Sequence, residues 1–175
     1  MPEPSSLLID YLSTPIGNLA LVADAQGNLR VALFTEDDAV ITRYLQLQYG
    51  AGGFVLETAR NPQGLTDAIA AYFAGNLNAI DALPVQAGGT PFQRDVWRAL
   101  REIPCGTTLS YGKLAERIGR PAAVRAVGMA NGANPVAVVV PCHRVIGSNG
   151  SLTGYGGGIE RKRWLLNHEK TPTLF

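Results

Sequence analysis

Apolar and polar residues alternate along much of the first third of the chain. Residues 7–15 read LLIDYLSTP, and residues 17–34 read GNLALVADAQGNLRVALF, with many residues that favour strands. Glycine-asparagine pairs at Gly17 and Gly27 fall between these runs and are typical of tight hairpin turns. The pattern predicts a small antiparallel sheet.

Apolar residues then change to helical spacing. Residues 38–49 and 65–73 place apolar side chains three and four positions apart, which predicts two helices, and Gly75 ends the second one. The stretch 81–89, DALPVQAGG, is rich in residues that break helices and strands, so we expect a linker there.

A sharper helix signal follows the linker. Thr90 and Pro91 form a cap and a first-turn proline, and they open a predicted amphipathic helix over 91–103 that ends at Pro104.

A second pair of helices follows. Ser110 caps a predicted helix over 111–119, and Pro121 separates it from another over 122–132. Two short helices across a glycine turn match a DNA-binding helix-turn-helix, although ordinary helical hairpins share this pattern. We expect an α+β protein with a small antiparallel sheet and helices first, and a helical, winged-helix-like second part.

Charge separates the two parts. The predicted N-terminal domain, 1–87, carries nine acidic residues and three arginines, for a net −6, whereas 88–175 carries twelve basic and five acidic residues, for +7. Such asymmetry is expected when one part of a chain faces a polyanion, and attraction between the two parts is the alternative. The charge favours 88–175 as the part that faces a polyanion such as DNA, and 1–87 as the part that does not.

Composition excludes several other classes. No stretch approaches the roughly 20 apolar residues of a membrane span, and the first residues lack a secretory leader, so we expect a cytoplasmic protein. The two cysteines, Cys105 and Cys142, are too few to hold a structural zinc by themselves and are expected to be free thiols. We expect no metal and no cofactor.

The helix predicted over 122–132 has a slim surface. It offers mostly small residues, with Arg125 as its only long cation, whereas readers of the major groove usually present long polar side chains. A slim helix can approach a narrow groove closely, and a single arginine can enter the base stack. The alternative is that the small residues pack inside the domain.

Candidate chemistry concentrates after an apolar run, VAVVV over 136–140, which reads as a buried strand or core segment. Cys142 follows it. A free cysteine is mostly protonated at neutral pH unless a neighbour lowers its pKa or accepts its proton, and His143 and Arg144 are the candidates. A direct pair between Cys142 and His143 requires a bend or a bridging water. A buried structural cysteine is the alternative.

The surrounding residues resemble a known family. VVPCHRVIG at 139–147 is similar to the active-site signature of the O6-alkylguanine-DNA alkyltransferases, also called methylated-DNA-protein-cysteine methyltransferases. The resemblance covers the C-terminal half from TPFQRDVWRAL onward and includes AYFAGNL at 71–77. It implies single-use DNA repair, in which the protein takes an alkyl group from O6 of guanine, and possible activity on O4-alkylthymine.

The resemblance also implies roles for individual residues. Cys142 is the acceptor, His143 relays its proton through a water, Glu169 orients His143, and Tyr111 donates a proton to the leaving guanine. Asn134 links the helix-turn-helix to the active-site segment. The DNA-binding set is Arg125, Ala123, Ala126 and Gly128, and the base pocket is formed by Pro141, Val145, Tyr155 and Gly156.

Two details differ among family members. Some have serine where this chain has Gly156, and some carry a zinc whose ligands this chain lacks in its first half. The implied partner is double-stranded DNA that contains O6-alkylguanine, bound by a monomer. Two rival functions remain: a non-catalytic winged-helix binder of DNA lesions, and a cysteine hydrolase.

Overall fold

The computed structural model describes residues 3–170. The chain divides into two compact units, each described by itself. The first contains the residues up to Gly89 together with Pro135–Val139, and the second contains Thr90–Asn134 and the residues from Val140 onward. No helix within the described part is both long and apolar enough to cross a bilayer.

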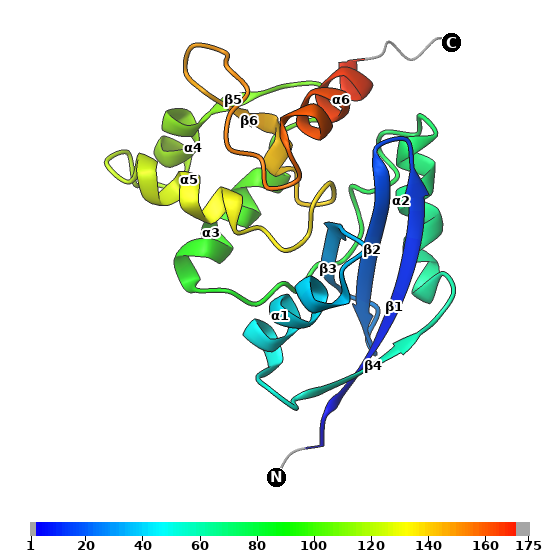
Figure 1. The fold of residues 1–175 in the computed structure, drawn as a ribbon. Coiled ribbons are helices and arrows are strands. Elements are labelled where there is room, and N and C mark those ends of the chain that lie inside the picture. Colours follow the sequence, from blue (N-terminus) through cyan, green and yellow to red (C-terminus); the bar gives the residue numbers. More distant parts are fainter. Residues whose placement is uncertain (1–2, 171–175) are drawn as a thin grey trace. The chain divides into compact units, whose positions relative to one another are not determined.

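The first unit is built on a four-stranded sheet with the order β3-β2-β1-β4 (Figure 1). β1 (Ser5–Thr14), β2 (Gly17–Asp24) and β3 (Leu29–Phe34) form the predicted antiparallel meander. The turn glycines both adopt positive φ, Gly17 at 117° and Gly27 at 85°, which disfavours other residues there. The predicted antiparallel sheet is therefore confirmed.

A parallel edge strand completes the sheet. β4 (Phe54–Thr58) pairs with β1 in parallel, a strand that the sequence pattern did not predict. Its first three residues, Phe54 to Leu56, are all apolar, so the sequence shows no alternation there, whereas in the structure Phe54 and Leu56 pack against the core and the backbone pairs with β1.

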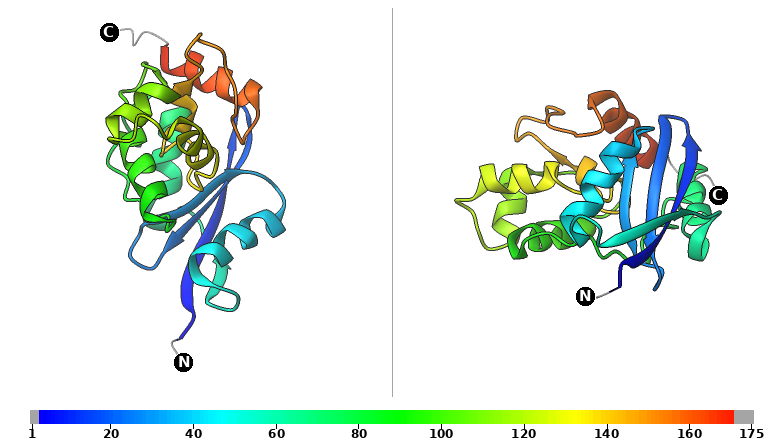
Figure 2. Two further views of the ribbon diagram at one scale, coloured as in Figure 1. Left: turned by 90° about the vertical axis from the view of Figure 1, so that its left-hand side faces the viewer. Right: turned by 60° about the horizontal axis from the view of Figure 1, so that its bottom comes forward.

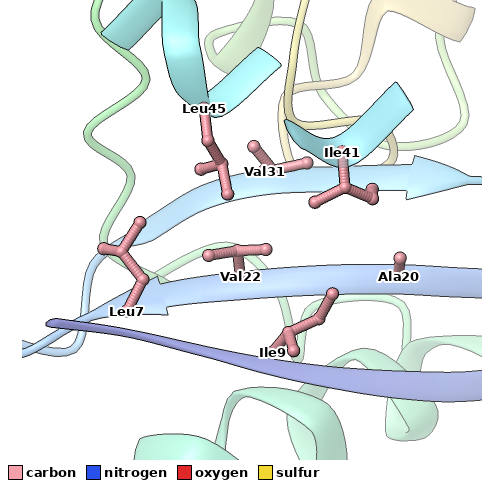
Figure 3. Close-up of a cluster of buried hydrophobic side chains, with 7 residues drawn as sticks. All are labelled: Leu7, Ile9, Ala20, Val22, Val31, Ile41 and Leu45. Atoms are coloured by element: carbon pink, nitrogen blue, oxygen red, sulfur yellow. The ribbon is translucent and has the colours of Figure 1, made fainter. Parts of the chain in front are cut away.

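The first unit's core lies between the sheet and α1 (Asp38–Tyr49). Ile41 and Leu45 of the helix point onto apolar side chains of three strands (Figure 3). The strand residues in this cluster are Leu7, Ile9, Ala20, Val22 and Val31. The unit also contains the short 3₁₀ turn η1 (Pro62–Gly64) and α2 (Leu65–Phe73), which packs against β1.

Helices α3 (Pro91–Arg101), α4 (Tyr111–Arg117) and α5 (Val124–Gly132) form one group in the second unit (Figure 2). Thr90 caps α3 in a reciprocal capping box with Gln93, and Ser110 caps α4 by accepting from the Lys113 N–H. Both predicted caps are confirmed, as is the predicted turn between α4 and α5.

The remaining elements of the second unit carry the chemistry described below. They are the short parallel pair β5 (Leu109–Ser110) and β6 (Val145–Ile146), the 3₁₀ turn η2 (Cys142–Arg144), and α6 (Ile159–Lys170). The loop between β6 and α6 lies beside α6 (Figure 1).

The apolar run 136–140 is the predicted core segment rather than a strand. Its five residues are buried, and its only backbone bridge to a strand within the described residues joins Val136 to Ala32. Val138 has φ 72°, a strained value for a β-branched residue, and this breaks any extended run.

Candidate active site

Cys142 begins the 3₁₀ turn η2, directly after the buried apolar run. The turn supplies the bend that a pairing of adjacent side chains requires. Burial raises the pKa of the Cys142 thiol, and a hydrogen bond from Asn134 and the charge of Lys162 oppose that rise only in part. The sulfur in this structure is therefore a thiol at neutral pH.

His143 is held by Glu169 of α6. His143 Nε2 lies 2.8 Å from Glu169 Oε2, and both side chains are buried. Burial is the main cause that lowers the His143 pKa, and it outweighs the hydrogen bond to Glu169, which raises it. His143 is therefore neutral. A carboxylate only accepts, so Nε2 carries the proton and Nδ1 is the free base.

Arg144 contacts Glu169 of α6. Its Nε donates to Oε1 of Glu169 and its Nη2 donates to Oε2, both at a distance of 2.9 Å. Its Nη1 donates to the Ile103 carbonyl at 2.8 Å. Although burial raises the pKa of Glu169, the hydrogen bonds from His143 and Arg144 hold it well below its usual range. Glu169 is thus an anion at neutral pH.

The neighbouring His168 lies away from this cluster. Its ring stacks on Trp164 with a centroid separation of 4.6 Å. Because adjacent helical side chains point about 100° apart, Glu169 can contact His143 only if His168 faces elsewhere.

Tyr111, the first residue of α4, lies in the same region. Its side chain is half-buried, and its hydroxyl donates to the Thr153 carbonyl at a distance of 3.1 Å. Burial raises the pKa of this phenol. Gly128 of α5 faces this ring, and a Cβ there would make an ordinary van der Waals contact with Tyr111 Cδ1 at 3.8 Å. A proton donor therefore lies between the helix-turn-helix and the loop before α6.

Two asparagines tie α5 to the cysteine segment. Asn134 Nδ2 donates to the Val140 carbonyl at a distance of 2.8 Å, and Asn131 Nδ2 donates to the Cys142 carbonyl at 3.4 Å. Both amides are buried. Asn134 thus makes the link that the resemblance implied, while sequence reasoning missed Asn131 because a single asparagine in a helix carries no distinctive pattern.

Lys162 is a second residue that sequence reasoning missed. Its side chain is fully buried, and its ammonium donates to the Thr153 carbonyl at a distance of 2.8 Å. The ammonium nitrogen lies 6.0 Å from the centroid of the Tyr111 ring. No carboxylate forms an ion pair with it among residues 3–170. A signal existed in the sequence: Lys162 and Glu169 lie seven positions apart on α6, and therefore on one face, together with the buried Leu165 and Leu166.

Several buried polar atoms around Cys142 lack hydrogen-bond partners. Of five such side-chain atoms in the described residues, three belong to this site: Asn131 Oδ1, His143 Nδ1 and Tyr155 Oη. Buried polar groups are normally paired, so the cluster matches a site that binds a polar ligand or water.

The other predicted pocket residues surround the same segment. Pro141 and Val145 flank η2 and are buried, and Tyr155 is buried in the loop before α6, whereas Gly156 is exposed. A Cβ on Gly156 would lie 3.8 Å from the Gly132 carbonyl, so a serine would fit at this position.

The predicted DNA-binding residues lie at the start of α5. Arg125 and Ala126 are exposed, and Ala123 and Gly128 are half-buried. On the inner side, Val127 and Ala130 are buried, and the Trp97 indole donates to the Ala130 carbonyl. The small residues therefore divide between an exposed face and a packed face. The packing alternative holds for Ala130, and close approach of the exposed face to a DNA groove stays a prediction.

The described residues contain no group of three or more His, Cys, Asp or Glu side chains that could hold a metal ion. Cys105 and Cys142 are both free cysteines.

Comparisons with known proteins give the family. Residues 7–87 match the ribonuclease-like domain of 6-O-methylguanine DNA methyltransferase, and residues 91–171 match its DNA-binding domain. The methylated-DNA-protein-cysteine methyltransferases of Shigella flexneri and Salmonella typhimurium are 53% and 54% identical over 163 residues, which cover 93% of this chain and 95% of each relative.

Solved structures agree with this assignment. The O6-methylguanine methyltransferase of Mycobacterium tuberculosis is 40% identical with a TM-score of 0.78, covering 96% of this chain and 95% of that one. The same organism's protein in complex with DNA is 42% identical with a TM-score of 0.75, covering 95% and 93%. This chain therefore belongs to the 6-O-methylguanine DNA methyltransferase family.

Proposed function

We propose that this chain repairs double-stranded DNA by moving an alkyl group from O6 of guanine to Cys142. As a member of its family it is a methyltransferase of DNA repair that uses a protein cysteine. One observation carries the assignment to Cys142. The adjacent His143 is neutral, is held at Nε2 by Glu169, and keeps Nδ1 as a free base.

The proposed reaction proceeds by attack on a saturated carbon. The thiol proton passes to His143 Nδ1 through a water, the sulfur attacks the alkyl carbon, and the carbon–O6 bond breaks with its electron pair left on the guanine. Tyr111 gives its phenolic proton to the ring, and the proton on His143 returns to Tyr111 through solvent. The products are a stable thioether and guanine, so each chain acts once.

Tyr111 must change partners during this reaction. Its phenol donates to the Thr153 carbonyl in the free protein, and the entering base takes the place of that acceptor. Tyr155 and Gly156 of the same loop, with Pro141 and Val145, are proposed to line the base pocket. Asn134 is proposed to hold the cysteine segment against α5.

DNA binding is proposed to use the exposed start of α5. A slim face made of Ala123, Ala126 and Gly128 suits close approach to a groove, and Arg125 is the long cation that takes the place of the flipped nucleotide. In this scheme residues 88–175 bind DNA and perform the chemistry, and residues 1–87 have a structural role.

A labelled substrate tests the proposal. Duplex DNA with a single radiolabelled O6-methylguanine is incubated with excess protein, and the modified peptide is identified by mass spectrometry. We expect one methyl group per chain on Cys142, and none with Cys142→Ser. Methyl on the Cys105 peptide alone would contradict the acceptor assignment. Repeated turnover would favour a hydrolase, and binding without transfer would favour a lesion binder.

Three further expectations belong to this proposal. A cytoplasmic location fits a reaction that needs a reduced thiol, and cell fractionation tests it. Light scattering tests the proposed monomer. Elemental analysis of the purified protein, together with the reaction in the presence of a chelator, tests whether it acts without metal or cofactor.

A further inference from the structure

The side chain of Asn131, near the end of α5, uses only one end of its amide. Its Nδ2 donates to the Cys142 carbonyl at a distance of 3.4 Å, whereas its Oδ1 has no hydrogen-bond partner among the described residues. Asn131 is only 2% exposed, so bulk solvent does not serve this oxygen either. Burying an acceptor without a donor costs free energy, and a ligand that supplies the donor recovers it.

The orientation of this amide follows from its contact with Cys142. A carbonyl oxygen only accepts, so the NH₂ group of Asn131 must face the Cys142 carbonyl and Oδ1 must face away from it. Asn134, the other asparagine that ties α5 to this segment, differs. Its Nδ2 donates to the Val140 carbonyl at 2.8 Å, and neither of its amide atoms is among the buried atoms without a partner in the described residues.

The surroundings of Asn131 are those of the proposed base pocket. Cys142 begins η2 beside it. The loop before α6 lies against the end of α5, because a Cβ on Gly156 would be 3.8 Å from the Gly132 carbonyl. Tyr155 of that loop contributes a second buried oxygen without a partner, its Oη. Asn131 therefore lies where η2, the end of α5 and this loop meet.

The base of the proposed substrate can supply the missing donor from one group only. An alkyl group on O6 leaves N1 of guanine without a proton, so N1, N3 and N7 are all acceptors. The exocyclic amine on C2 is then the single N–H donor of the base. A buried acceptor in a pocket for this base therefore has one complementary partner.

We propose that Asn131 is a specificity-determining residue whose Oδ1 accepts a hydrogen bond from the exocyclic amine of the flipped guanine. The inference rests on the proposed transfer of the alkyl group from guanine to Cys142. A pocket that hydrogen-bonds a substrate group rejects an analogue without that group, because its own buried polar atom is left unpaired. O6-methylhypoxanthine is such an analogue, since it has the shape and the O6-methyl group of O6-methylguanine but lacks the amine.

A comparison of the two bases tests this proposal. Duplexes with O6-methylguanine or O6-methylhypoxanthine at one position react with excess protein, and the rate of methyl transfer to Cys142 is measured. We expect wild type to prefer the guanine, and Asn131→Leu to reduce the ratio of the two rates about tenfold, with most of the loss on the guanine. Asn131→Ala removes the same oxygen with a smaller side chain, so we expect the same change.

The ratio isolates the contact from other effects of a substitution. Any difference in flipping between the two bases is common to all variants and cancels when their ratios are compared. Both rates are measured on the same protein, so the ratio does not depend on how much of a variant folds. The comparison in wild type requires no variant at all.

Asn134→Leu is the matched control. It makes the same substitution in the other asparagine of this segment, so we expect slower transfer from both bases and an unchanged ratio. Equal rates on the two bases in wild type, an unchanged ratio in both Asn131 variants, or an equal fall of the ratio in Asn134→Leu overturns the proposal. Methyl on Cys142 with an unchanged ratio refutes only this inference, whereas methyl on another residue refutes the proposed function.

Discussion

Replacing Glu169 by glutamine is expected to destabilise the fold as well as slow repair. Glutamine has nearly the same shape but only one acceptor oxygen. In either orientation of the amide, Arg144 keeps at most one of its two hydrogen bonds to this side chain, and the new NH₂ group faces an N–H of Arg144. The variant therefore leaves a buried guanidinium without its counter-charge.

The size of the effect follows from burial. Breaking one partner of a buried ion pair typically costs about 3–5 kcal/mol, because the remaining charge is left uncompensated. That is a large part of a total stability of roughly 5–15 kcal/mol. Removing both partners is far less costly, since no isolated charge remains. We expect Glu169→Gln with Arg144→Met to recover at least about 2 kcal/mol of the loss.

Urea unfolding of the four proteins in this cycle measures these free energies. The pH dependence gives an independent check. Because the folded-state pKa of Glu169 lies below its ordinary value of 4.5, its contribution is present above that value and disappears as the pH falls toward the folded-state pKa. The gap between wild type and Glu169→Gln is therefore constant at neutral pH and narrows in acid.

Two results would refute this reasoning. A loss below about 1 kcal/mol in Glu169→Gln would mean that water reaches and solvates the guanidinium. A double variant no more stable than the single one would mean that the charge on Arg144 is not the cause of the loss. Either result would leave orientation of His143 as the only role of Glu169.

Three further variants test other parts of the site. Lys162→Met removes a buried ammonium that has no ion-pair partner among residues 3–170, so we expect a higher melting temperature together with slower alkyl transfer; a lower melting temperature would show that its bond to Thr153 matters more. Arg125→Ala is expected to slow repair of duplex DNA more than reaction with the free base O6-benzylguanine, since only the duplex needs flipping, and equal losses would indicate a role in folding. Cys105→Ser is expected to keep full single-turnover activity with the labelled duplex, and loss of methyl transfer to Cys142 would contradict this.

Local signals predicted the elements whose cause is itself local. The caps at Thr90 and Ser110 and the turn glycines at Gly17 and Gly27 depend on a few adjacent residues, and each lies where the sequence indicates. β4 lacked such a signal because its pairing partner β1 and the core that its side chains contact lie more than forty positions away along the chain. The apolar run before Cys142 was equally ambiguous, since burial alone does not distinguish a strand from an irregular core segment.

The residues of the site could be predicted from the sequence where they match the family's motifs. The resemblance suggested Cys142, His143 and Glu169, and the structure brings the latter two within hydrogen-bond distance. It did not reveal that Arg144 binds Glu169, because the direction of the arginine side chain depends on how η2 turns against α6. Lys162 was missed because lysine in a helix is normally solvated, and only the tertiary fold buries it.

The charges in this site match the reaction better than they match the resting state. Glu169 and Arg144 neutralise each other, which leaves Lys162 as the buried cation of the described site without an ion-pair partner. In the proposed reaction the negative charge moves from the sulfur of Cys142 to the guanine and then to the phenolate of Tyr111. Lys162 acts electrostatically on Cys142 and lies near the Tyr111 ring, so in this scheme its charge would be compensated while the reaction proceeds. A fixed cation that is uncompensated at rest stabilises the transition state more than the ground state, and this difference is what accelerates a chemical step.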